Sequence, residues 1–186
     1  MVISFTGTGS CGKSTLLQRC KEEFGDRFSY VEEVTRQVKR DYKVPINEQG
    51  SNITQILIMN QHVINAIQNP ENVIMDRCCI DGIVYTAWLS AQGKVDQWVE
   101  DYAANVCEML IDKLDIIFYC SADFPLVDDG ERSANNKFRD DINFLIDNFL
   151  RDRNLLSKVV KLSGSVEQRM EVIKQTIQNH GITYTR

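Results

Sequence analysis

Short apolar runs alternate with longer amphipathic stretches along most of this chain. Five of the runs are rich in β-branched or aromatic residues and end at polar or turn residues, which is typical of buried strands. They lie near residues 2–6, 28–31, 73–76, 116–120 and 159–162. Strands that alternate with helices through right-handed crossovers form a parallel sheet with helices on both faces. We therefore expect an α/β fold, a three-layer sandwich around a five-stranded parallel sheet.

Between these runs, apolar residues recur at three- and four-residue spacing, which predicts helices. One helix is expected to begin near Lys13. The others are expected over residues 54–67, 81–89, 95–114, 139–151 and 166–179. Two segments lack the pattern. Residues 37–53 contain Pro45 and Gly50 and are expected to form a loop or a broken helix over the site. Residues 123–139 form a long polar loop that becomes basic towards its end, as functional lids often do.

A glycine-rich motif stands between the first strand and the first helix. Residues 7–14 fit the phosphate-loop pattern G-x-x-x-x-G-K-[ST], which places glycines where backbone N–H groups must approach phosphate oxygens. The partial positive charge of the helix N-terminus adds to this attraction. Lys13 can reach the β- and γ-phosphates, and the Ser14 hydroxyl can ligate Mg²⁺. The motif in this context predicts binding of a nucleoside triphosphate with Mg²⁺.

Carboxylates and arginines follow the second and third expected strands. Glu33 and Arg36 come after the second strand, and Asp76 and Arg77 end the third. The carboxyl ends of parallel strands form the ligand-binding edge of open α/β sheets. Two interpretations of Glu33 fit equally well. It is either a base or a ligand to a substrate hydroxyl, or an ordinary solvated residue at the start of a helix. Asp76 fits a Mg²⁺-orienting or hydroxyl-activating acid, and the alternative is an ordinary strand end.

Composition is that of an ordinary globular domain. The 186 residues are 43% hydrophobic and 25% charged, so we expect a single domain over residues 1–186. No apolar run approaches the roughly 20 residues of a membrane span, and the chain enters its first strand without room for a signal peptide. The six cysteines lie inside strand and helix patterns, which predicts reduced thiols and a cytoplasmic location. The net charge of −5 argues against an extended nucleic-acid footprint and leaves a local basic groove open.

These features together resemble the small-molecule kinase branch of phosphate-loop proteins. The likeness is greatest to the nicotinamide riboside kinase domain of the bacterial NAD-biosynthesis regulator and to the AAA-type ATPase domains grouped with it. Four stretches carry it: residues 5–15, 33–36, 73–76 and 127–133, followed by Arg139. The Asp76-Arg77 pair is instead similar to thymidylate and deoxynucleoside kinases. The nucleotide-binding positions on this view are Gly7, Thr8, Gly9, Ser10, Cys11, Gly12, Lys13, Ser14 and Thr15.

The resemblance implies an ATP-dependent kinase that phosphorylates a hydroxyl of a nucleoside-like acceptor. Ser14 and Asp76 would hold Mg²⁺, and Asp76 or Glu33 would deprotonate the acceptor. Arg132 and Arg139 would close from the lid, and with Lys13, Glu33 and Asp76 they form the expected catalytic set. Glu33, Arg36 and Arg77 would bind the acceptor. The alternative acceptors are a nucleoside monophosphate and, as a phage-type enzyme would use, a 5-hydroxymethyl-pyrimidine in DNA. A regulatory ATPase without a small-molecule acceptor is the rival class.

Overall fold

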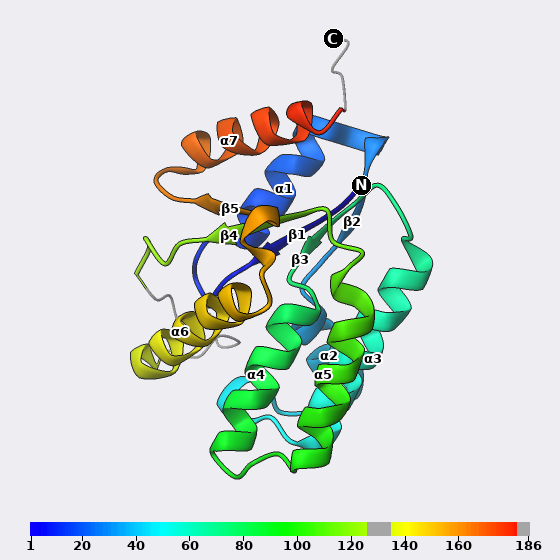
Figure 1. The fold of residues 1–186 in the computed structure, drawn as a ribbon, viewed down its shortest axis with the longest axis vertical. Coiled ribbons are helices and arrows are strands. Elements are labelled where there is room, and N and C mark those ends of the chain that lie inside the picture. Colours follow the sequence, from blue (N-terminus) through cyan, green and yellow to red (C-terminus); the bar gives the residue numbers. More distant parts are fainter. Residues whose placement is uncertain (126–134, 182–186) are drawn as a thin grey trace.

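A parallel sheet forms the centre of the molecule (Figure 1). The computed structural model describes residues 1–125 and 135–181. Its sheet has the order β2-β3-β1-β4-β5, and every neighbouring pair of strands is parallel. The strands are β1 (Val2–Thr6), β2 (Ser29–Val31), β3 (Val73–Asp76), β4 (Ile116–Cys120) and β5 (Val159–Leu162). The expected phosphate-loop α/β fold is confirmed.

Helices cover the two faces of the sheet (Figure 1). One layer holds α1 (Lys13–Phe24) and α7 (Val166–Asn179). The other holds α3 (Asn52–Gln68), α4 (Cys79–Ala91), α5 (Gln97–Ile111) and α6 (Asn136–Asp152). The nine-residue helix α2 (Val34–Tyr42) packs against α3 beside the edge strand β2. Three short 3₁₀ segments complete the described elements: Gly25–Arg27, Asn47–Gln49 and Leu155–Lys158.

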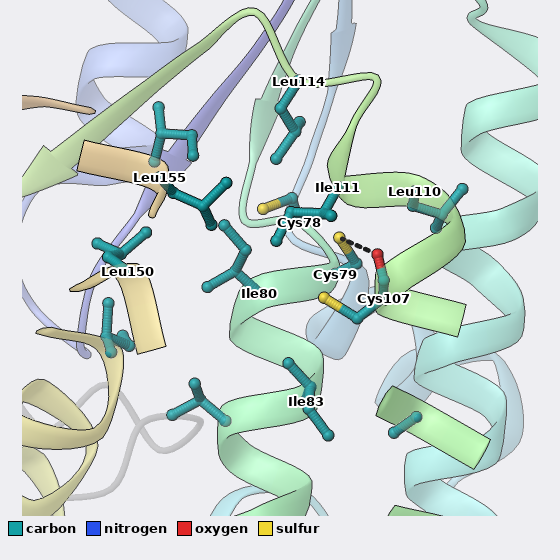
Figure 2. Packing of buried hydrophobic residues seen from close by; sticks show 14 of the residues in the cluster. Cys78, Cys79, Ile80, Ile83, Cys107, Leu110, Ile111, Leu114, Leu150 and Leu155 are labelled. Carbon is teal, nitrogen blue, oxygen red and sulfur yellow. Dashed lines mark hydrogen bonds between the residues drawn. The ribbon is translucent and has the colours of Figure 1, made fainter. Parts of the chain in front are cut away.

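Two cores separate the sheet from its helix layers because the central strands are apolar on both faces. All five residues of β4 are buried, with Phe118 facing the α1 and α7 layer and Ile117 facing the opposite layer. Phe118 stacks on Phe5 of β1 at 5.6 Å between ring centroids. Figure 2 shows the other core, where Ile80 and Ile83 of α4 pack towards α5 and α6. Parallel strands buried on both faces read as continuous apolar runs, which is why the sequence reveals them.

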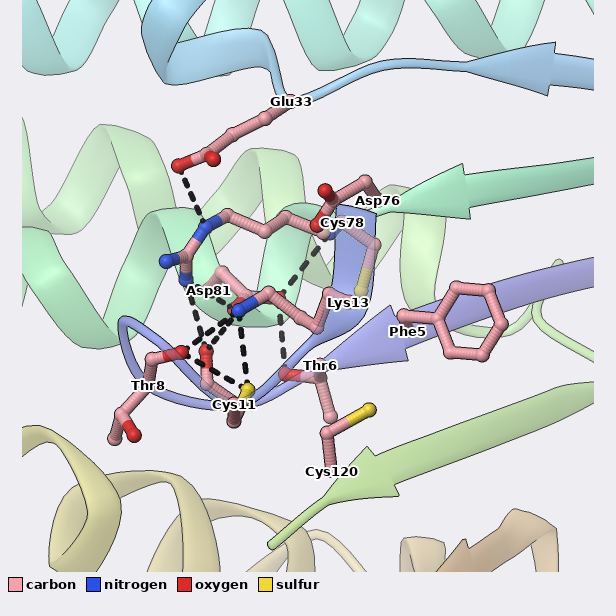
Figure 3. Close-up of polar contacts among 12 residues, drawn as sticks. Phe5, Thr6, Thr8, Cys11, Lys13, Glu33, Asp76, Cys78, Asp81 and Cys120 are labelled. Atoms are coloured by element: carbon pink, nitrogen blue, oxygen red, sulfur yellow. Dashed lines mark hydrogen bonds and ion pairs between the residues drawn. The ribbon is translucent and has the colours of Figure 1, made fainter. Parts of the chain in front are cut away.

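The strand order predicts that ligands bind at the carboxyl ends of the strands. The chain runs from β1 to β2 and back to β3 on one side of β1, and then crosses to β4 and β5 on the other side, so the direction of the connections reverses beside β1. Crevices at such reversals hold ligands in open α/β sheets. The glycine-rich loop, Glu33 and Asp76 all lie at this edge (Figure 3).

Three helix boundaries differ from those expected. The segment 37–53 is not a loop throughout, because α2 continues to Tyr42; Val34 and Val38 are its buried residues, too few to show a clear period. Helix α4 begins at Cys79, so Asp81 belongs to its first turn and forms a capping box with Cys78. Helix α6 begins at Asn136, where the Asn135 side chain accepts a hydrogen bond from the Phe138 N–H at 3.2 Å.

The described residues contain no helix that is long and apolar enough to cross a membrane. All six cysteines are buried and free, as the sequence predicted. Several lie in the cores, where a thiol packs as a small apolar group. In Figure 2 the Cys79 thiol points to the carbonyl oxygen of Cys107, at 3.8 Å.

Candidate functional site

The glycine-rich loop curls around the ammonium group of Lys13 (Figure 3). Gly7 and Gly12 have φ values of 141° and 86°, a region that residues with a Cβ rarely adopt. A Cβ on Gly7 would lie 2.8 Å from the Cys120 carbonyl oxygen. Lys13 Nζ donates to the carbonyl oxygens of Gly7 and Thr8 at 3.1 and 2.7 Å. These contacts hold the cation of Lys13 inside the curve of the loop.

Ser14 and Asp76 meet beside the loop, as expected for a cation site. The Ser14 hydroxyl donates to Asp76 Oδ2 at 2.6 Å. Asp76 is buried, and its Oδ1 has no hydrogen-bond partner among the described residues. Burial raises the pKa of Asp76 to about 6. A buried carboxylate oxygen without a donor, next to a hydroxyl, suits Mg²⁺, which takes few protein oxygens and otherwise water and phosphate oxygens.

Glu33 lies between two arginines at the opposite side of this edge. Arg77 Nε donates to Glu33 Oε1 at 3.0 Å, and Arg36 Nε donates to Glu33 Oε2 at 3.2 Å. Burial opposes ionisation of Glu33, but Arg77, Lys13 and Arg36 outweigh it and lower its pKa. Glu33 is therefore a carboxylate at neutral pH. Glu33 and Arg36 are three residues apart at the start of α2, a spacing that brings two side chains together on one helix face.

Three hollows lined by Glu33 open at this edge, and one of them lies beside α1 and α2, where Ser14, Arg36 and Asp76 contribute to its lining. The other two adjoin each other. The first of these two is lined by the glycine-rich loop together with Glu33, Arg36, Arg77 and Arg139. The second is lined by Glu33 and Arg77 together with residues of α2, the 3₁₀ segment Asn47–Gln49, α3 and α4. These further residues are Val34, Thr35, Asn47, Gln55, Ile58, His62, Asp81, Gly82 and Tyr85. Four residues line both hollows and so stand at the boundary between them: Glu33, Asn47, Arg77 and Tyr85.

Arg139 reaches the site from the start of α6. It lines the first hollow, and its Nη2 donates to the Phe124 carbonyl oxygen at 2.7 Å. Its buried Nε has no partner among the described residues, so a donor is left for a ligand. Arg132 and the stretch 127–133 lie outside the described residues, as does most of the lid expected over 123–139. Lys137 is exposed and points to Asp141 at 3.9 Å, away from the loop.

The structure therefore brings together the loop, Lys13, Ser14, Glu33, Arg36, Asp76, Arg77 and Arg139. Sequence reasoning missed the second hollow and its residues Gln55 and Tyr85, which sit inside ordinary helix patterns. It also placed Asp81 only at the start of the expected helix 81–89, although its carboxylate accepts from Thr6 and Arg77. The signal for Asp81 was its position four residues after Arg77, with which it forms an ion pair.

The fold and the glycine-rich loop define a phosphate-loop protein, and a family model places the chain more closely. A model described as an AAA domain matches residues 2–169, so the chain belongs to that family. No curated protein matches the chain by sequence.

Solved structures with the same fold include NadR and a deoxyadenosine kinase. NadR in complex with NAD and AMP-PNP aligns at a TM-score of 0.74 and 17% identity, over 100% of this chain and 51% of that one. NadR in complex with NR aligns at 0.76 and 18%, over 100% and 53%. Deoxyadenosine kinase from M. mycoides, with dCMP and dCDP bound, aligns at 0.72 and 16%, over 97% and 100%. The chain thus spans about half the length of NadR and nearly the whole length of the deoxyadenosine kinase.

Proposed function

We propose that this protein is an ATP-dependent kinase that phosphorylates a hydroxyl group of a nucleoside-like acceptor. The observation that carries the proposal is the position of Glu33. It is an ionised carboxylate held by two arginines at the boundary between the loop's hollow and a second hollow. A protein that only hydrolyses ATP needs no second hollow on the far side of Glu33.

The loop side of the site is the ATP side in this proposal. The N–H groups of residues 7–14 and the α1 N-terminus hold the triphosphate, with Thr15 in the first turn of that helix. Lys13 Nζ then exchanges the Gly7 and Thr8 carbonyl oxygens for β- and γ-phosphate oxygens. Ser14 and Asp76 would hold Mg²⁺, which would neutralise charge on the transferring phosphoryl group. Arg139 adds a positive charge from the lid side.

The second hollow is the acceptor side, and its charge favours an acceptor without a phosphate there. Its lining contains the carboxylates of Glu33 and Asp81 but one guanidinium, that of Arg77, among the described residues. Burial lowers the pKa of His62 to about 4, so His62 adds no charge at neutral pH. The hollow is therefore net negative and repels a phosphate group. A nucleoside fits this field better than a nucleoside monophosphate does.

The transfer follows from this arrangement. The acceptor hydroxyl oxygen attacks the γ-phosphorus while the bond to the β–γ bridging oxygen breaks, and ADP leaves. Glu33 orients the hydroxyl and takes its proton. A base with a lowered pKa is a weak one, but phosphoryl transfer has a loose transition state in which positioning matters more than early proton removal. The arginines that lower the pKa of Glu33 also fix its direction.

A panel of acceptors tests the proposal through ADP release. It contains nicotinamide riboside, deoxynucleosides, the matching monophosphates, and DNA with and without 5-hydroxymethyl pyrimidines. We expect one nucleoside to raise ADP release well above the rate without acceptor, and its monophosphate to do so far less. A preference for a monophosphate or for DNA would overturn the acceptor assignment. Equal slow hydrolysis with every acceptor and with none would point to a regulatory ATPase.

A further inference from the structure

The Asp81 carboxylate is a buried junction between three segments of the chain. Its Oδ1 accepts from Arg77 Nη1 at 2.8 Å, and its Oδ2 accepts from the Thr6 hydroxyl at 2.9 Å and from the Cys78 N–H at 3.2 Å. Thr6 ends β1 directly before the glycine-rich loop, while Arg77 and Cys78 follow β3. Figure 3 shows Asp81 close to Lys13 and Thr6, with the loop running beneath it in this view. Only 3% of its surface is exposed.

Arg77 is the partner of Asp81 that reaches both halves of the site. Its Nη1 also donates to the Gly7 carbonyl oxygen at 3.0 Å, and its Nε donates to Glu33. Its Nη2 makes no hydrogen bond to the described residues. The guanidinium therefore has one edge fixed on Asp81 and the loop and one nitrogen left for a ligand in the adjoining hollows.

The backbone of Arg77 needs such an anchor. Its φ is 75°, a left-handed conformation that is unfavourable for a side chain of this size and persists only where the surroundings over-determine it. The Arg77 N–H donates to the Phe5 carbonyl oxygen at 2.9 Å, and the side chain is held at its far end by Asp81. Without Asp81, Nη1 would keep the neutral Gly7 carbonyl oxygen as its acceptor and would lose its charged partner.

We propose that Asp81 is a positioning residue that holds Arg77, and through Arg77 the Glu33 carboxylate, in the geometry that phosphoryl transfer requires. This inference rests on the proposed function. A carboxylate that served only as a helix cap would stabilise α4 and would act independently of Arg77. The two roles differ in whether the effect of removing the Asp81 charge depends on Arg77.

A double-mutant cycle separates the two roles. Asp81→Asn keeps the shape and a cap oxygen but removes the charge, and it is made in the wild-type and in an Arg77→Gln background. We expect kcat to fall by about 10- to 100-fold in the wild-type background and by less than about threefold in the Arg77→Gln background. The KM for ATP should stay within about threefold of the wild-type value. An equal loss in both backgrounds would overturn the positioning role.

Thr6→Val is the matched control for the packing around Asp81. It removes one donor to Asp81 and leaves the carboxylate on Arg77, so we expect kcat to fall by less than about threefold. A loss as large as that of Asp81→Asn would contradict an action through Arg77.

A spectroscopic readout tests the inference without any turnover. The ¹⁵N-labelled Arg77 Nε–H signal, assigned by its loss in Arg77→Gln, should exchange slowly in the wild-type protein and faster in Asp81→Asn. An unchanged signal would overturn the positioning role even if the acceptor panel succeeds. If the panel fails and the signal still changes, the proposed function falls while the link between Asp81 and Arg77 stands.

Discussion

Two carboxylates at neighbouring strand ends have opposite environments, although the sequence offers both for the same role. Asp76 accepts from Ser14 at 2.6 Å, and burial raises its pKa to about 6. Glu33 is held by Arg77 and Arg36, whose charges outweigh burial and lower its pKa. Asp76 thus has the surroundings of a cation ligand, whereas Glu33 is ionised and lies beside the proposed acceptor side. We assign the base role to Glu33 on this difference.

Glu33→Gln tests this assignment. Gln keeps the size and removes the proton acceptor, so kcat should fall by at least about 100-fold. Binding of Mg²⁺ and a non-hydrolysable ATP analogue, measured by calorimetry, should stay within a few-fold of wild type. Asp76→Asn is the comparison variant and should remove the Mg²⁺-dependent part of that affinity. If Glu33→Gln retained a third or more of kcat, Asp76 would be the better candidate for the base.

Much of the site could be predicted at the residue scale because it lies at strand ends. The apolar runs fix where β2 and β3 end, and Glu33, Asp76 and Arg77 follow from that position. Asp81 could not be assigned in this way. Its hydrogen bond with Thr6 joins residues 75 positions apart, and only the packing of α4 against β1 brings them together.

At the scale of single elements, the glycine-rich loop shows which glycines the fold itself requires. Gly7 has a φ of 141°, and a Cβ there would lie 2.8 Å from the Cys120 backbone oxygen and 3.1 Å from Cys11 Sγ. Gly9 has no atom within 4 Å of such a Cβ. The sequence pattern contains both glycines without distinguishing these roles. The structure shows that Gly7 lets the loop approach the end of β4 closely.

Gly7→Ala should therefore destabilise the nucleotide-free protein, and Gly9→Ala should not. Backbone strain alone costs roughly 1–3 kcal/mol, and the contact with the Cys120 oxygen adds to it. Thermal and urea unfolding of both variants without nucleotide measure the difference. Equal stability of the two variants would contradict the geometry of the loop. A loss of ATP binding in Gly9→Ala with unchanged stability would mean that the nucleotide itself approaches Gly9.

The helix boundaries show where local patterns fail at this scale. Helix α2 is polar on most of its surface, with Val34 and Val38 as its buried residues, and so it was expected to be a loop or a broken helix. The start of α4 depends on the Cys78 and Asp81 capping box, and cysteine is not a residue that signals a helix start.

At the scale of the whole molecule, a buried arginine on the last helix joins that helix to the loop. Arg169 is 1% exposed, and its Nη1 donates to the Cys11 carbonyl oxygen at 2.7 Å. Its Nε donates to the Gly164 carbonyl oxygen, and its Nη2 pairs with Asp123 Oδ2, both at 3.0 Å. Residues at positions 11, 123 and 164 are thereby fixed to one side chain.

Arg169→Met should destabilise the protein by roughly 2–4 kcal/mol, because it leaves buried carbonyl oxygens without donors. Arg153→Met is the control, since Arg153 pairs with Glu108 at the surface and its loss should cost less than about 1 kcal/mol. Urea denaturation of both variants gives the comparison. A similar small effect for both would show that Arg169 does not support the fold. No sequence pattern indicates this role, because an arginine in an amphipathic helix is normally solvent-exposed.

The most direct test of the whole account follows the γ-phosphoryl group of ATP. With γ-labelled ATP and the acceptor that the panel selects, we predict label in the acceptor in molar proportion to the ADP formed. Glu33→Gln should lower that transfer by at least about 100-fold. Recovery of the label only as inorganic phosphate, with every acceptor and with none, would contradict the kinase and leave an ATPase.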